Sequence, residues 1–171
     1  MVTCAAFFLG LCAALALSLG YALLSLLLLW CSGLLDVVDG SIARLTHASN
    51  PFGAFIDLIS DRMVECALIL SFSFLYPQNS FFYCLFLTSI LLHFSTFVLA
   101  GALFKNEGEK SMHYDHSLVE RAEAFVVFSC MILIPSYQLT VLIIFTGIVF
   151  AGGIQRMLKV WNYTQQSSLK L

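Results

Sequence analysis

Charged side chains are scarce in this sequence. Asp, Glu, Lys and Arg together make up 11% of its 171 residues, whereas hydrophobic residues make up 60%, and the mean hydropathy is +0.94. A soluble domain carries about 25% charged residues, so the composition excludes an ordinary soluble domain and indicates an integral membrane protein. The formal net charge of −2 excludes a general nucleic-acid binder, because such a protein needs a basic surface.

The sequence also has few prolines and no cysteines at paired spacing. The six cysteines lie in apolar segments without paired spacing, which indicates free, small core residues rather than disulfides. The three prolines, Pro51, Pro77 and Pro135, stand where apolar runs break, as expected of turns. Because no separate soluble segment or repeat is evident, we expect one transmembrane domain over residues 1–171.

The apolar runs predict an all-α, polytopic membrane protein. Residues 1–35 contain no charged side chain, which suits one ~20-residue span and most of a second. A signal peptide is the alternative, but no basic segment precedes Phe7. Breaks between the runs predict six transmembrane helices, at about 2–18, 20–46, 51–76, 80–104, 117–134 and 137–161.

Basic residues predict the orientation of these helices. The expected loops at 18–21, 76–80 and 135–138 carry no Lys or Arg, whereas the Lys and Arg residues lie at or near the other side. By the positive-inside rule that other side is cytoplasmic, together with both termini.

Four aspartates interrupt the apolar sequence between residues 36 and 61. Asp36 and Asp39 share one side of a helix with Gly40, Ala43 and Arg44. On the next helix, Gly53, Asp57 and Asp61 follow each other at i, i+4 and i+8 and share one face. A short polar link, 46–51, predicts that the two helices are antiparallel neighbours whose acidic faces meet.

These carboxylates predict a metal site. An Asp at the membrane centre costs roughly 2.5–3.5 kcal/mol on insertion scales, so helix packing alone does not account for four of them. Carboxylates at one place repel each other unless cations bind between them. With no Cys or second His in register, the ligands are oxygens, which suits Mg²⁺ or Mn²⁺ and disfavours Zn²⁺.

The neighbours of the aspartates point to a phosphate ligand. Gly40, Ala43 and Gly53 leave the helix surfaces bare beside the acids, and the guanidinium of Arg44 offers a fork of donors that fits a phosphate. A nucleoside diphosphate suits this combination. A divalent-cation transporter or channel is the alternative, but it gives no reason for Arg44 or for the small residues.

The pattern D-x2-D-G-x2-A-R-x8-G-x3-D-x3-D at residues 36–61 resembles the signature of the CDP-alcohol phosphatidyltransferases. The resemblance implies a transfer of a phosphatidyl group from CDP-diacylglycerol, or a related donor, to an alcohol, with release of CMP. It implies two Mg²⁺ or Mn²⁺ ions on Asp36, Asp39, Asp57 and Asp61, with Asp61 as general base. Gly40, Ala43, Arg44 and Gly53 would bind the donor. Membrane lipids and a second copy in a homodimer are the other expected partners.

The acceptor alcohol stays open at this point. Leu-x-Glu-Arg-x-Glu at 118–123 looks like a stretch in family members that use inositol phosphate or glycerol phosphate acceptors. Arg121, helped by Lys105 or Lys110, is therefore the candidate that binds an acceptor phosphate. Family members usually begin with an amphipathic surface helix before the first span, and this sequence starts inside that region, where Thr3 is a possible cytidine contact.

Four further polar residues have ordinary explanations. His113 and His116 are expected to be loop residues, since no Cys or acidic cage accompanies them. His93 is expected to make a hydrogen bond between helices. Arg62 points about 100° away from Asp61 and is expected to pair structurally or to reach the membrane surface, with a substrate role as the alternative.

Overall fold

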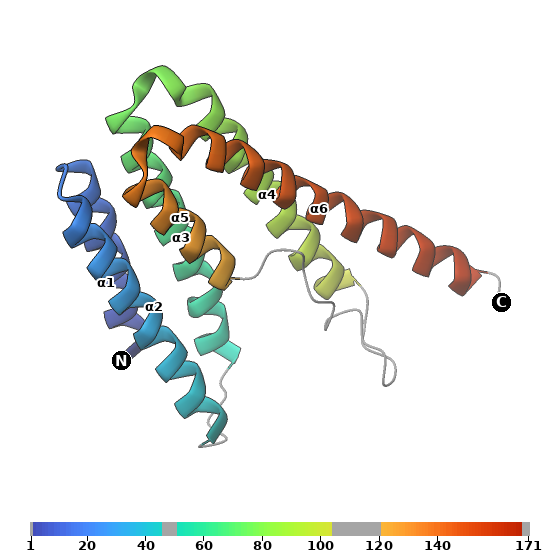
Figure 1. The fold of residues 1–171 in the computed structure, drawn as a ribbon. Coiled ribbons are helices and arrows are strands. Elements are labelled where there is room, and N and C mark those ends of the chain that lie inside the picture. The colour runs from blue at the N-terminus through green and yellow to red at the C-terminus, as the bar shows by residue number, and fades with distance from the viewer. Residues whose placement is uncertain (1, 46–50, 104–120, 169–171) are drawn as a thin grey trace.

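The computed structural model describes residues 2–45, 51–103 and 121–168, which are helical apart from short turns (Figure 1). The six α-helices and two 3₁₀ turns are α1 (Val2–Ser18), α2 (Ala22–Leu45), α3 (Pro51–Leu75), η1 (Pro77–Asn79), α4 (Ser80–Leu103), α5 (Arg121–Leu133), η3 (Pro135–Tyr137) and α6 (Gln138–Ser168). The all-helical class is confirmed. The largest difference from the expected ranges is at the end of α6, which continues past residue 161 because no Gly or Pro follows Gly153.

Gly20 ends α1. Its φ of +85° is a left-handed conformation that side chains disfavour. The Tyr21 N–H donates to the Ala16 carbonyl at 2.9 Å and the Gly20 N–H donates to the Leu17 carbonyl at 2.9 Å. This pair of bonds is the Schellman motif, which satisfies the last carbonyls of a helix and reverses the chain.

Pro77 and Pro135 open two turns of the same construction. Each begins a three-residue 3₁₀ helix that leads directly into α4 or α6. The N–H of Asn79 donates to the Tyr76 carbonyl at 3.0 Å, and the N–H of Tyr137 donates to the Ile134 carbonyl at 3.0 Å. Proline is tolerated there because the first positions of a helix need no N–H.

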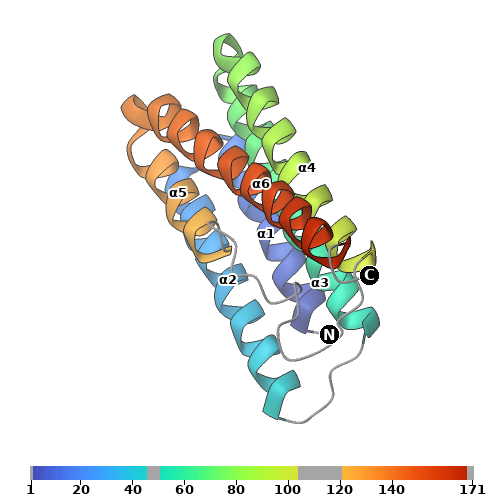
Figure 2. The same cartoon turned by 90° about the vertical axis from the view of Figure 1, so that its right-hand side faces the viewer.

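Three helix pairs dominate the packing among the described residues. α1 packs along α2 and α3, and α4 packs along α6, with α5 between α2 and α6. Figure 2 shows α4 and α6 side by side from a second direction. The core that joins all six helices contains Leu29, Leu68, Phe72, Phe86, Phe128 and Leu142.

The acidic faces of α2 and α3 meet, and α1 packs against both helices. In the part of the chain that the structure describes, most close backbone contacts of α2 and of α3 with other elements are made with α1; α2 also contacts α5, and α3 also contacts α4. Small residues explain why α1 fits there: Gly10 lies so close to α3 that an added Cβ would be 2.6 Å from Val64. The acidic residues of α2 and α3 therefore lie close together beside α1.

The outer surface is apolar. Leu23, Phe74 and Phe81 are each more than 70% exposed (71%, 74% and 71%), which is typical of side chains that face lipid. Three described stretches, Ala22–Ile42, Pro77–Leu103 and Pro135–Gln165, are long and apolar enough to cross a membrane. The apolar parts of α1 and α5 are shorter, and α3 carries four charged residues between Asp57 and Glu65. The chain is an integral membrane protein.

Candidate active site

Three of the four signature aspartates converge. Asp36 on α2 and Asp57 and Asp61 on α3 are half-buried, and one carboxylate oxygen from each lies within 4.8 Å of the others. The i, i+4 spacing stacks Asp57 below Asp61 on one face. Both α2 and α3 pack on α1, which brings Asp36 to that face.

These oxygens fit a hard divalent cation. All three donors are carboxylates, which Mg²⁺ and Mn²⁺ prefer. A cavity of about 10 Å³ lies beside Asp36 and Asp61, with Thr3, Ser32 and Ser60 among its lining residues. This volume is near the lower limit for one water-sized species, and its walls are polar enough to hold an ion or its water.

Asp39 lies outside the three-carboxylate group. Its carboxylate accepts a hydrogen bond from the Thr3 hydroxyl of α1. The contact ties the start of α1 to the acidic face of α2. A ligand role for Asp39 stays a prediction, as does a cytidine contact for Thr3.

In the part of the chain that the structure describes, Gly53 packs against no other side chain. A Cβ added there would meet nothing within 4 Å, whereas one added at Gly33 would lie 2.6 Å from the ring of Phe125. Gly53 is exposed at the start of α3, one turn before Asp57. The open surface beside the acids is what the donor-binding prediction requires.

The structure describes only some of the other predicted site residues. Gly40 is half-buried on α2, directly after Asp39. Ala43 and Arg44 belong to the last turns of α2, and Arg121 is the first residue of α5; their side chains lie outside the description. Lys105, Lys110, His113 and His116 lie outside the described residues, so their roles stay predictions.

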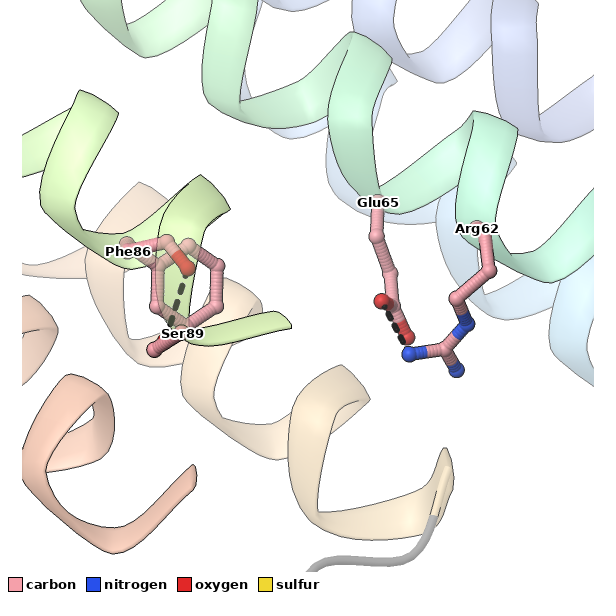
Figure 3. A network of polar contacts seen from close by, with 4 residues as sticks. All are labelled: Arg62, Glu65, Phe86 and Ser89. Carbon is pink, nitrogen blue, oxygen red and sulfur yellow. Dashed lines mark hydrogen bonds and ion pairs between the residues drawn. The ribbon is translucent and has the colours of Figure 1, made fainter. Parts of the chain in front are cut away.

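Arg62 pairs with Glu65, the structural role that was expected for it. Their side chains point toward one another from successive turns of α3 (Figure 3), with Arg62 Nη1 2.7 Å from Glu65 Oε2. Glu65 is 8% exposed and was not singled out from the sequence. Its signal was available, because Glu65 continues the four-residue spacing of Gly53, Asp57 and Asp61.

Arg156 is a second buried charge that the sequence analysis did not single out. It is 8% exposed, and its Nη1 donates to the backbone carbonyl of His93 at 3.3 Å. Its guanidinium lies 5.1 Å from the centre of the Phe97 ring. The link between α4 and α6 expected at His93 therefore involves its main chain.

A family model described as CDP-alcohol phosphatidyltransferase matches residues 1–154. The chain belongs to the CDP-alcohol phosphatidyltransferase family. The matched range contains the whole acidic signature, the Arg62–Glu65 pair and most of the helices.

Among curated members of the family, the CDP-diacylglycerol–inositol 3-phosphatidyltransferase of Candida albicans is 33% identical over 111 residues, which are 59% of this chain and 46% of that protein. The human protein of the same name is 35% identical over 75 residues, 42% of this chain and 35% of that protein. This chain thus spans less than half of these relatives. The archaetidylinositol phosphate synthase of Methanothermobacter thermautotrophicus is 27% identical over 162 residues, 90% of this chain and 80% of that protein.

Solved structures of the family share the fold. The Mycobacterium tuberculosis phosphatidylinositol phosphate synthase PgsA1 with CDP-DAG bound has a TM-score of 0.77 at 18% identity, covering 94% of this chain and 84% of that one. The same enzyme in complex with manganese and citrate gives a TM-score of 0.78 at 18% identity, covering 94% and 80%. The helical arrangement is therefore that of a CDP-alcohol phosphatidyltransferase.

Proposed function

We propose that this chain transfers a phosphatidyl-type group from a CDP-linked lipid, such as CDP-diacylglycerol, to an inositol-type alcohol and releases CMP. The observation that carries the proposal is the convergence of Asp36, Asp57 and Asp61, whose carboxylate oxygens lie within 4.8 Å of one another. Membership of the family, whose model covers residues 1–154, supports the reaction class.

The reaction makes one bond and breaks one. An acceptor hydroxyl oxygen forms a bond to the lipid-linked phosphorus of the donor, and the bond from that phosphorus to the bridging diphosphate oxygen breaks. The electron pair leaves with CMP, and the hydroxyl proton goes to a carboxylate. Asp61 is the proposed base, since its place in the cluster would put it beside the reacting phosphorus, and contact in the reactive pose matters more than its basicity.

Asp36, Asp57 and Asp61, with Asp39 at the next turn of α2, are the proposed ligands of two Mg²⁺ or Mn²⁺ ions. When bound, such ions neutralise the diphosphate and the charge that develops on the leaving CMP. The manganese complex of PgsA1 supports this choice of metal. Arg44 is proposed to hold a donor phosphate, and Gly40, Ala43 and Gly53 to leave room for the nucleotide.

The proposed class of acceptor is based on the names of related proteins. Two of them carry inositol in their names, as a CDP-diacylglycerol–inositol 3-phosphatidyltransferase and an archaetidylinositol phosphate synthase. An inositol ring, free or phosphorylated, is therefore the proposed acceptor in preference to glycerol 3-phosphate. Arg121, with Lys105 or Lys110, is proposed to bind the phosphate of a phosphorylated acceptor.

The proposal includes the arrangement in the membrane. Residues 1–171 form one domain in which all six helices cross the bilayer, with the acidic site and both termini on the cytoplasmic side. The positive-inside distribution of Lys and Arg supports that orientation. Two copies associate as a homodimer within the lipid, which cross-linking in native membranes would test.

The deciding experiment measures CMP release. Purified protein in nanodiscs is given CDP-diacylglycerol and, in turn, myo-inositol, myo-inositol 1-phosphate, glycerol 3-phosphate or serine. We expect CMP only with Mg²⁺ or Mn²⁺ and an inositol-type acceptor. Metal binding without CMP release from any acceptor would favour the cation-transporter alternative.

A further inference from the structure

The first turn of α1 reaches the acidic face of α2. The Thr3 hydroxyl donates a hydrogen bond to the Asp39 carboxylate, and both residues are half-buried. Thr3 also lines the small cavity beside Asp36 and Asp61. An uncharged residue of α1 thus binds the signature aspartate that lies outside the three-carboxylate group.

The pairing of α1 with α2 fixes this contact. The turn at Gly20 joins the two helices, which pack along each other. Further along the pair, a Cβ added to Gly10 would lie 3.2 Å from Ser32 Oγ. The same number of residues separates Thr3 from Gly10 and Ser32 from Asp39, so both contacts belong to one antiparallel register. The hydrogen bond to Asp39 therefore follows from the packing of the helices.

Two further contacts hold the start of α1 in place. Ser32 Oγ donates to the Ala6 carbonyl at 2.7 Å, one turn after Thr3. On the other side, Gly10 lies against Val64 of α3. The first turns of α1 are thus fixed to both of the helices that carry the acids, and the Thr3 hydroxyl is presented to Asp39 at a defined place.

This arrangement suits a carboxylate that binds a metal ion. Such a ligand is commonly oriented by a hydrogen bond from an outer partner, and loss of the partner typically costs about 10–100-fold in metal affinity. A carboxylate has about four acceptor sites on its two oxygens, so the bond from Thr3 leaves sites on Asp39 for a cation. Because the hydroxyl is uncharged, it orients Asp39 without neutralising the charge that attracts the metal.

We infer that Thr3 is a positioning residue of the metal site, whose hydroxyl orients Asp39 so that this carboxylate completes the ligand set of the three converging aspartates. The inference rests on the proposed function, in which Asp39 is a metal ligand. It differs from the cytidine contact predicted for Thr3 from the sequence, because it requires no nucleotide.

The test titrates Mn²⁺ into the full chain in phosphatidylcholine nanodiscs without any CDP-linked lipid, and measures the free ion by electron paramagnetic resonance. Wild-type protein should bind two ions. Thr3→Val keeps the shape of the side chain and removes the hydroxyl, so it should weaken binding of one ion about tenfold or more. The other ion should bind nearly as in wild type. Thr3→Ser, which keeps a hydroxyl, should retain both affinities.

A double-mutant cycle tests whether Thr3 acts through Asp39. Asp39→Asn should weaken binding of the same ion. The protein that carries both Thr3→Val and Asp39→Asn should then bind Mn²⁺ like Asp39→Asn alone, because residues that share one interaction do not have additive effects. Additive losses would show that Thr3 acts on the metal by another route and would refute the inference.

Ser71→Ala is the matched control. Ser71 lies about three turns beyond Asp61 on α3, and its Oγ donates to the Ala14 carbonyl of α1 at 2.7 Å. This variant removes a different hydroxyl bond to α1, so it should lower the temperature of unfolding without changing Mn²⁺ binding. An equal loss of Mn²⁺ affinity in Ser71→Ala would assign the effect to loosening of α1 and overturn the positioning role. Thr3→Ala replaces Thr3→Val if that variant does not fold.

The outcomes separate this inference from the proposed function. Wild-type protein that binds no Mn²⁺, or Thr3→Val protein that binds it as wild type does, would overturn the inference. If Thr3→Val then raises only the KM for CDP-diacylglycerol, Thr3 contacts the nucleotide, and the transferase activity stands. Mn²⁺ binding that depends on Thr3, without CMP release by wild type from any acceptor, would instead support the positioning role and refute the transferase.

Discussion

Two glycines show how a missing side chain serves different purposes at the scale of one residue. A Cβ added to Gly10 on α1 would lie 2.6 Å from Val64 of α3, whereas one added to Gly53 would meet nothing within 4 Å among the described residues. Gly10 therefore lets two helices approach, as small residues commonly do in membranes. Gly53 leaves a surface open one turn before Asp57, where the donor is proposed to bind.

Gly53→Leu is expected to abolish binding of the CDP-linked donor while the protein remains folded. The leucine fills open space rather than a packed contact, so the temperature of unfolding should change little. Donor binding is measured by titration of CDP-diacylglycerol into protein in nanodiscs, and folding by thermal unfolding.

Gly10→Leu is the contrasting variant. Its side chain would push α1 away from α3, and overpacking of this kind costs typically about 1–3 kcal/mol, so it should lower the temperature of unfolding. Unchanged donor binding in a folded Gly53→Leu protein would show that this glycine does not admit the nucleotide.

Single residues also mark the limit of the sequence analysis. The aspartates and Gly53 were found because charge and fixed spacing are visible in an apolar sequence. Glu65 and Arg156 were missed because burial is not visible in the sequence: both are only 8% exposed. Spacing along α3 could have identified Glu65, whereas Arg156 contacts His93 and Phe97 of another helix.

At the scale of the helix, the ends of the helices could be predicted from the sequence, but the apolar faces that pack against other helices could not. Pro51, Pro77 and Pro135 begin helical segments, and Gly20 ends one, because these residues act on the local backbone. The packed face of α4 could not be read in the same way, since that helix is apolar all round. The packing of α1 on α3 could not be read either, because it depends on residues far apart in the sequence, such as Gly10 and Val64.

The pairing of α4 with α6 provides an element-scale prediction. Tyr83 and Gln138 are buried, and the Tyr83 hydroxyl donates to Gln138 Oε1 at 2.7 Å. Tyr83→Phe removes the donor and leaves a buried acceptor, which costs about 1–3 kcal/mol. We expect a lower temperature of unfolding, with inositol-dependent CMP release retained below it.

Thr88→Ala is the control on the same helix. Thr88 is exposed, and its hydroxyl donates to the Cys84 carbonyl within α4 at 2.9 Å, so its loss should not loosen α4 from α6. Equal unfolding temperatures for both variants would show that the Tyr83–Gln138 bond adds nothing to the packing of these helices.

The whole molecule concentrates acidic groups at one place in an apolar body. Asp36, Asp57 and Asp61 repel one another unless cations lie between them, so removal of divalent ions should affect both activity and stability. We expect excess EDTA to abolish CMP release and to lower the temperature of unfolding, because an ion that binds only the folded state stabilises it by mass action.

Re-addition of Mg²⁺ or Mn²⁺ should restore both properties, and Asp36→Asn should respond weakly to either ion. Full turnover in excess EDTA would refute the metal site. A site that EDTA inactivates but that only Zn²⁺ restores would contradict the choice of metal drawn from the oxygen ligands.

Arg121 tests whether the protein binds a phosphate of the acceptor apart from the donor. It is the first residue of α5, far along the chain from the aspartates, and a phosphorylated acceptor needs a cation to bind its phosphate. Arg121→Ala should raise the KM for myo-inositol 1-phosphate about tenfold or more, as for a lost charge-assisted contact of ~1.5–3 kcal/mol. The KM for CDP-diacylglycerol should change little.

Arg44→Ala is the matched comparison, since it should instead impair use of the donor. Steady-state kinetics with each substrate varied in turn separates the two effects. If Arg121→Ala leaves the KM for the phosphorylated acceptor unchanged in correctly inserted protein, Arg121 is only a solvated helix end. An acceptor without a phosphate, such as an unphosphorylated cyclitol, would then be the better candidate substrate.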